Sequence, residues 1–266
     1  MTEWRGARLK MIRTGERGSA RSGQNPRKKQ NQGDIMKKHL LLALILTVSI
    51  FAGGSFCSAQ VGAGPSITLP PAEVILNACK DMGVEVVDGQ YVISKVDDII
   101  NKTGKVFVID ARPGVTYDDG FIPTAFSMFD AKFNLIYPKF EKLNIPKDTE
   151  IFIGIGRPCP MSLVDIKKLK EKGYTNLKAF VKGPVFFERY FSEVTVKGAK
   201  KLVANGAVVV NLAADPDLSK FFAANIAKDK IVVVTGSADQ AKTNYALTDK
   251  VYKAGYKNTA VLNGDI

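Results

Sequence analysis

Residues 94–110 read SKVDDIINKTGKVFVID, and residues 195–211 read TVKGAKKLVANGAVVVN. The two stretches align without a gap at an offset of 101, and each joins a short helical segment to an apolar run. An uninterrupted apolar run is typical of a strand that is buried on both faces of a parallel sheet. The sequence therefore predicts an α/β fold, and the repeat predicts it twice.

Two further matches support the repeat. Residues 151–153 (IFI) align with 231–233 (IVV) at an offset of 80, and residues 173–176 (GYTN) align with 255–258 (GYKN) at an offset of 82. The second copy is about 20 residues shorter between its first two core strands, and the sequence ends soon after its last strand. We predict two related domains, residues 91–191 and a truncated 194–266, each a mostly parallel sheet flanked by helices. Residues 60–90 are expected to form a linker and a short helix.

The basic character of the chain is concentrated at its start. Residues 1–38 hold 11 Lys or Arg and three acidic residues, which is +8 of the net +12. The remaining charge is ordinary, and the lysine runs at 167–172 and 197–201 are expected to be solvated helix faces. Since they lack interleaved aromatic residues, no nucleic-acid partner is predicted.

The segment from Met36 to Ala59 has the pattern of a bacterial signal peptide. Two lysines precede an apolar run, and a small-residue site stands before Gln60. We expect a periplasmic or otherwise exported protein with no stable membrane span after cleavage, because the run is shorter than the roughly 20 residues of a span. Residues 1–35 are expected to be an over-extension or a disordered basic tail. A lipoprotein acylated at Cys57 is a weaker alternative.

Cleavage after Ala59 would leave two cysteines, Cys79 and Cys159, and no histidine. This excludes a Ser-His-Asp or Cys-His site and a four-ligand zinc site, so no metal and no cofactor is predicted. Cys79 lies on the apolar stripe of a helix predicted over residues 72–82 and is expected to be buried. The two thiols could form a disulfide, or one could stay reactive.

The first copy resembles the rhodanese-like family. Its predicted strand ends in Asp110-Ala111-Arg112, and residues 117–125 (YDDGFIPTA) are close to the family motif Tyr-x-x-Gly-His-Ile-Pro-Gly-Ala. Residues 145–148 (IPKD), an apolar strand, a loop, a helix and residues 173–176 follow in the family's order. The resemblance implies a five-stranded parallel sheet and a thiosulfate sulfurtransferase-like activity, in which a loop cysteine carries sulfane sulfur. Asp110 and Arg112 are expected to be structural.

The sequence departs from this family at the nucleophile. By strand register the position of the nucleophile falls on Ile155 or Gly154, and the corresponding position in the second copy is Thr235. Ile155 and Gly154 cannot attack a sulfur donor, and a threonine without a base is a poor sulfur acceptor, so the usual active site is degenerate. Cys159 follows in the same loop and is either a displaced nucleophile or an inert remnant.

The site predicted from the sequence centres on Cys159 as the catalytic residue. Gly156, Arg157, Met161 and Ser162 are the predicted substrate-binding residues, and Arg157 is expected to favour the thiolate. The partner would be a small sulfur-containing anion or a protein thiol. The alternative is an inactive binding module for a partner protein or a small anion. A phosphatase is excluded, because Asp165 stands where such an enzyme needs Arg.

Overall fold

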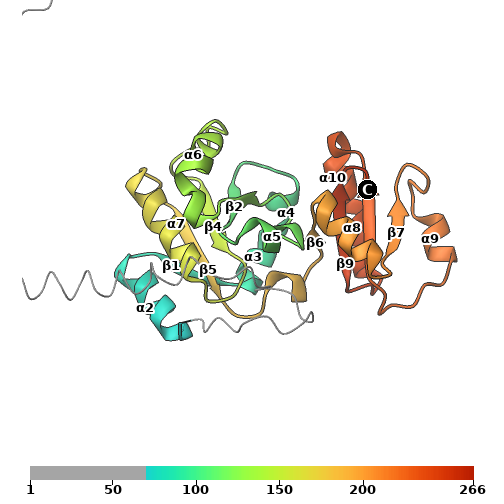
Figure 1. Cartoon of the computed structure of the whole chain (residues 1–266), viewed down its shortest axis with the longest axis horizontal. Helices are drawn as coiled ribbons and strands as arrows, with labels where there is room; N and C mark the ends of the chain where they lie inside the picture. Colours follow the sequence, from blue (N-terminus) through green and yellow to red (C-terminus); the bar gives the residue numbers. More distant parts are fainter. Residues whose placement is uncertain (1–69) are drawn as a thin grey trace, which may run out of the picture. The chain divides into compact units, whose positions relative to one another are not determined.

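The computed structural model describes residues 70–266 (Figure 1). The predictions for residues 1–35 and for the leader Met36–Ala59 lie outside the described residues. Within residues 70–266 no helix is long and apolar enough to cross a membrane.

The first sheet has five strands in the order β1-β5-β4-β2-β3, and every neighbouring pair is parallel. The strands are β1 (Glu85–Asp88), β2 (Val106–Asp110), β3 (Phe126–Ser127), β4 (Glu150–Gly154) and β5 (Leu177–Lys182). Strand β1 lies inside the segment 60–90 that was expected to be a linker and a helix. The sheet therefore begins before residue 91.

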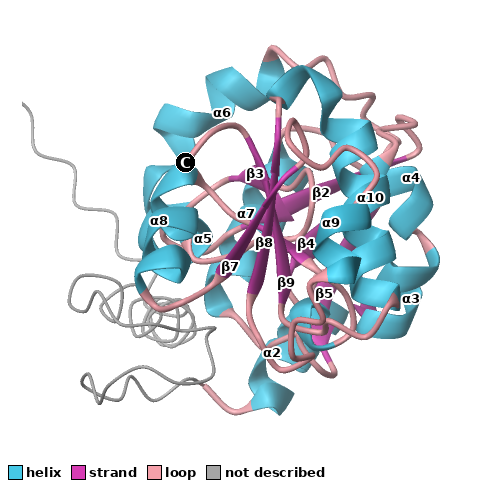
Figure 2. Cartoon of the chain, turned by 90° about the vertical axis from the view of Figure 1, so that its right-hand side faces the viewer, coloured by secondary structure: helices cyan, strands magenta, loops and turns pink. Residues whose placement is uncertain are grey.

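Helices cover both faces of this sheet, as the apolar strands predict. In Figure 2 the strands lie between helices. One face packs against α2 (Ala72–Asp81), α6 (Phe133–Glu141) and α7 (Pro160–Glu171), and the other against α3 (Gly89–Ser94), α4 (Val96–Ile100) and the 3-10 turn η3 (Phe186–Glu188). Side chains alternate along β4, where Ile151 and Ile153 face the first group and Phe152 the second.

The second sheet is parallel and has four strands in the order β6-β9-β8-β7. Its elements are β6 (Ser192–Glu193), α8 (Val196–Ala204), β7 (Val208–Asn211), α9 (Ser219–Ala223), β8 (Val232–Gly236), η4 (Ala238–Gln240), α10 (Ala241–Lys253) and β9 (Thr259–Asn263). The order is that of the first sheet without a counterpart of β3. Between β2 and β4 the first sheet has α5 (Gly114–Asp118), β3, η2 (Asp130–Lys132) and α6, whereas only α9 lies between β7 and β8.

Strand pairing corrects the alignment that the sequence predicted between the two sheets. Phe107 pairs with Ile151 in the first sheet, and Val208 pairs with Val232 in the second. Because Phe107 and Val208 are 101 apart, Ile151 corresponds to Val232 at an offset of 81, not 80. Thr235 then corresponds to Gly154 rather than to Ile155.

Glu193 of β6 connects the loop after α5 to the second sheet. Its carboxylate accepts hydrogen bonds from the Thr124 N–H (2.8 Å), the Tyr245 hydroxyl (2.8 Å) and Asn263 Nδ2 (2.8 Å). Its backbone exchanges two hydrogen bonds of 2.8 Å with Phe121. One residue thus joins four separate segments of the chain.

Candidate functional site

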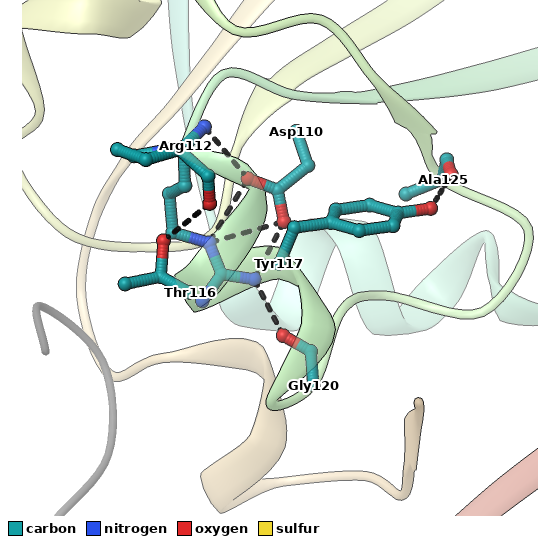
Figure 3. A network of polar contacts seen from close by, with 7 residues as sticks. Asp110, Arg112, Thr116, Tyr117, Gly120 and Ala125 are labelled. Atoms are coloured by element: carbon teal, nitrogen blue, oxygen red, sulfur yellow. Dashed lines mark hydrogen bonds and ion pairs between the residues drawn. The ribbon is translucent and has the colours of Figure 1, made fainter. Parts of the chain in front are cut away.

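The carboxyl ends of β2 and β4 lie side by side, because the strands are parallel neighbours. Asp110 is the last residue of β2, and its buried carboxylate accepts hydrogen bonds of 2.6 to 3.1 Å from the guanidinium of Arg112. Arg112 also donates to the Gly120 carbonyl at 2.5 Å, and the Tyr117 hydroxyl donates to the Ala125 carbonyl at 2.6 Å (Figure 3). The expectation that Asp110 and Arg112 are structural is confirmed, since they fix the loop after β2.

Two glycines shape the loop after β4. Gly154 has φ +116, and a Cβ there would lie 2.4 Å from the Phe180 carbonyl oxygen. Gly156 has φ +102, and a Cβ there would lie 2.6 Å from the Pro184 carbonyl oxygen. Both positions therefore exclude a side chain. The N–H of Gly156, a predicted substrate-binding residue, donates to the Phe180 carbonyl at 2.9 Å and points into the protein.

The nucleophile position of the family resemblance is filled by a core residue. Ile155 is buried in the cluster that contains Phe180 and Phe186. Thr235, in the second sheet, is also buried.

Cys159 is the N-cap residue of α7. It is partly exposed and free, and Cys79 is a second free cysteine, buried on α2 in the core. The structure therefore holds no disulfide between them, and the prediction of a buried Cys79 is confirmed. A helix N-terminus presents unpaired N–H groups and a partial positive charge, which favours an anionic sulfur.

The pKa of the Cys159 thiol is nevertheless raised to about 11. Burial of the sulfur is the largest cause, and the negative charge of Asp110 adds to it. The backbone N–H groups of Ser162 and Met161 lower the pKa and offset part of the rise. Burial outweighs the helix N-terminus, so the thiol is protonated at neutral pH.

Arg157 does not favour a Cys159 thiolate as predicted, and its role in binding a substrate stays a prediction. Its guanidinium lies 3.6 Å from the carboxylate of Glu188, and both side chains are about half exposed. Since the pKa of Cys159 is raised, no thiolate is favoured beside it. The backbone N–H groups of Met161 and Ser162, by contrast, lower the pKa of the Cys159 thiol.

Asp165 is a buried residue that the sequence did not identify as part of a site. Its side chain is 0% exposed, and neither carboxyl oxygen has a hydrogen-bond partner. Burial, followed by the nearby charge of Asp130, raises its pKa to about 9. An available signal was its place on the buried stripe of α7 with Ser162, Ile166 and Leu169. Among residues 70–266 no group of three His, Cys, Asp or Glu could hold a metal ion.

No protein-family model matches the chain, and no curated protein matches it. Solved structures that match include a rhodanese-like domain from Anabaena (20% identity, 36% of this chain and 67% of that one, TM-score 0.28). A thiosulfate sulfurtransferase from Pseudomonas aeruginosa also matches (10% identity, 73% and 46%, TM-score 0.33). So does a 3-mercaptopyruvate sulfurtransferase from Escherichia coli (13% identity, 68% and 99%, TM-score 0.25). Because all three TM-scores lie below 0.5, none of these likenesses identifies the function of this chain.

Proposed function

We propose that this chain is an exported rhodanese-like protein, related to sulfurtransferases, that carries a sulfane sulfur atom on Cys159. The position of Cys159 carries the proposal. It is a free, partly exposed cysteine in the loop between β4 and α7, at the N-terminus of that helix, where the backbone N–H groups of Met161 and Ser162 lower the pKa of its thiol. Those donors would stabilise a negatively charged sulfur chain attached to Cys159.

The raised pKa indicates a carrier rather than a rapid enzyme. With a pKa of about 11, roughly one Cys159 in 10⁴ is a thiolate at pH 7. Since the thiolate is the nucleophile, Cys159 would accept sulfur slowly. A thiol of high pKa is also a poor leaving group, so sulfur once bound would be retained.

We infer further that the second sheet supports the first without chemistry of its own. Thr235 is buried in β8, and a threonine hydroxyl is a weak nucleophile unless an adjacent base activates it. Export rests on the leader from Met36 to Ala59, which precedes the described residues.

The test is to incubate the protein with thiosulfate, and separately with polysulfide, and to weigh the peptide that contains Cys159. The proposal expects a peptide heavier by one sulfur atom, formed faster at pH 9 than at pH 7. A Cys159→Ser variant should show no gain. No gain in the unaltered protein with either donor would overturn the proposal.

A second candidate is an inactive binding module for a partner protein or a small anion. The raised pKa of Cys159 favours it, as do Pro158 and Pro160, which have no N–H to offer a sulfur. Calorimetric titration of the Cys159→Ser variant with thiosulfate separates the two. Binding by this variant, together with no sulfur gain in the unaltered protein, would favour the module.

A further inference from the structure

The exposed face of helix α6 carries apolar and basic side chains together. Leu135 is 75% exposed, which makes it the most exposed large apolar side chain among residues 70–266. Leu143, two residues beyond the end of the helix, is 47% exposed. Isolated apolar side chains are common on protein surfaces, so Leu135 alone would need no explanation. The side chains around it distinguish this face.

Three lysines lie beside the two leucines. Lys139 and Lys142 follow Leu135 at spacings of four and seven residues, and this spacing places all three on one side of a helix. Lys132 precedes Leu135 by three residues, and Leu143 follows Lys139 by four. All five side chains are exposed. The opposite side of α6 packs into the core through three aromatic residues, Phe133, Tyr137 and Phe140.

The three lysines of this face have no partner within the described chain. None of their side chains forms an ion pair or a hydrogen bond with another residue of 70–266. Lys197 and Lys201 of α8, in contrast, pair with aspartates at the end of α5 at 3.2 and 2.7 Å. Two lysines of α8 are thus neutralised inside the chain, whereas the charge on α6 faces outward without a counterion.

The helix beside α6 adds to this positive charge. Lys168 and Lys172 of α7 lie over the rings of Phe133 and Tyr137, at 4.8 and 5.0 Å from the ring centroids (Figure 1). The acidic residue of α6 is Glu141, six residues after Leu135, which places it about 120° away around the helix. No acid therefore lies among the leucines and lysines of the exposed face.

Most of the excess positive charge of the described chain lies in this region. Residues 70–266 hold 27 Lys or Arg and 23 Asp or Glu, a net charge of +4. Residues 130–148 and 160–172, which include η2, α6 and α7, hold eight lysines and five acids, or +3. Charge complementarity therefore favours an anionic partner for this side of the first domain.

We propose that the exposed face of α6 binds the surface of an anionic phospholipid membrane. The lysine ammonium groups would attract the phosphate headgroups, while Leu135 and Leu143 enter the apolar layer below them. A protein partner would need a pocket to receive Leu135, because apolar anchors at protein interfaces fill pockets. A fluid lipid layer closes around a protruding leucine without one. Since no helix of residues 70–266 can cross a membrane, this attachment lies at the surface.

Vesicle flotation tests the proposal. The chain is prepared from Gln60 onward, because the apolar residues 40–52 would themselves bind lipid. A circular dichroism spectrum and a cooperative urea transition like those of the full chain first show that this form is folded. Vesicles contain phosphatidylcholine alone or equal parts of phosphatidylcholine and phosphatidylglycerol. The protein should float with the mixed vesicles only, and about 1 M salt should release it, because the Debye length is then about 3 Å.

Single substitutions assign the binding to α6. Lys139→Ala and Lys142→Ala should each lower the partition coefficient on mixed vesicles about fivefold, the worth of one lysine near an anionic surface. Leu135→Ser should lower it about tenfold, because an apolar side chain no longer leaves water. The matched controls are Lys242→Ala on α10 and Val74→Ser on α2. Both remove an exposed side chain elsewhere and should leave the partition coefficient unchanged.

A fluorescent reporter shows whether this face enters the lipid. Trp4 is the only tryptophan of the sequence, so the chain from Gln60 has none. The emission of a Leu135→Trp variant should shift to the blue on mixed vesicles and should be quenched by brominated acyl chains. Val74→Trp should show neither effect.

The proposal is overturned if the protein does not bind mixed vesicles, and an acidic protein would then be the partner that fits the charge of this face. It is also overturned if Lys242→Ala weakens binding as much as Lys139→Ala, because attraction would then follow net charge alone. Unchanged emission of the Leu135→Trp variant on vesicles that bind the protein would likewise exclude α6 as the binding face.

Discussion

Replacing Asp165 with Asn should make the protein more stable at neutral pH. The substitution keeps the shape of the side chain, and an amide cannot ionise in either the folded or the unfolded chain. Asp165 is fully buried and without a partner, and its counterpart in the second sheet is Leu247. Function rather than stability would then account for the acid, as is common at sites where a buried titratable group is retained.

The size of the expected gain in the free energy of unfolding follows from the raised pKa of Asp165. Below pH 3.8, its ordinary pKa, the carboxyl is protonated in both the folded and the unfolded chain, so it does not make stability depend on pH. Above that pH the unfolded chain releases the proton and the folded chain keeps it until about pH 9. Stability therefore falls by about 1.4 kcal/mol per pH unit in this window, which amounts to about 4 kcal/mol at pH 7.

The assay is urea unfolding of the unaltered protein and of Asp165→Asn at pH 4, 5.5, 7 and 8.5. The two proteins should be similar in free energy of unfolding at pH 4, and the variant should gain progressively up to about pH 9. Asp148→Asn is the matched control, because Asp148 is exposed and should give no pH-dependent gain. If the variant is no more stable at pH 7, or its gain does not grow with pH, the reasoning about a buried neutral carboxyl is refuted.

Three further predictions concern packing, the Glu193 contacts and the thiol. Gly198→Ala should lower the free energy of unfolding in urea by about 3 kcal/mol or more, because the new Cβ would lie 1.8 Å from a carbonyl oxygen of α5. The control is Gly114→Ala, which should be nearly neutral because the space around Gly114 is open. Glu193→Ala leaves three donors without their acceptor and should cost about 2–4 kcal/mol in thermal unfolding; an unchanged melting temperature would contradict the role given to that carboxylate. The rate of Cys159 alkylation by iodoacetamide should rise about tenfold per pH unit from 7 to 10, since the thiol pKa is about 11, and a plateau near pH 8 would show instead that the thiolate is stabilised.

Local sequence patterns predicted the regular elements of the described chain well. The apolar run at 106–110 is β2, and the helix expected between the loop and residues 173–176 is α7 (Pro160–Glu171). Hydrophobic periodicity and apolar runs are properties of neighbouring residues, so they can be seen without the rest of the chain. For the same reason Cys79, on the apolar stripe of a helix, was correctly expected to be buried.

Contacts between distant residues were not available from such patterns. The mixed sequence of β1 (EVVD) gave no strong signal, and only pairing with β5 makes it an edge strand. The predicted offset between β4 and β8 was one residue short, because a run of similar apolar residues aligns almost equally well in two registers. Backbone hydrogen bonds across the sheet set the register.

The sequence alone determined that this is an α/β protein with a cysteine in the loop after β4, because those features are local. The tertiary structure alone decided the chemistry of that loop. The pKa of the Cys159 thiol is raised although Cys159 lies at a helix N-terminus, because burial outweighs the effect of that N-terminus. Arg157 is close to Cys159 in sequence, but it pairs with Glu188 instead. Asp165 becomes a neutral acid because its neighbours come from η2 and β2. Burial and electrostatic surroundings depend on segments far apart in the chain, and they exist only once it has folded.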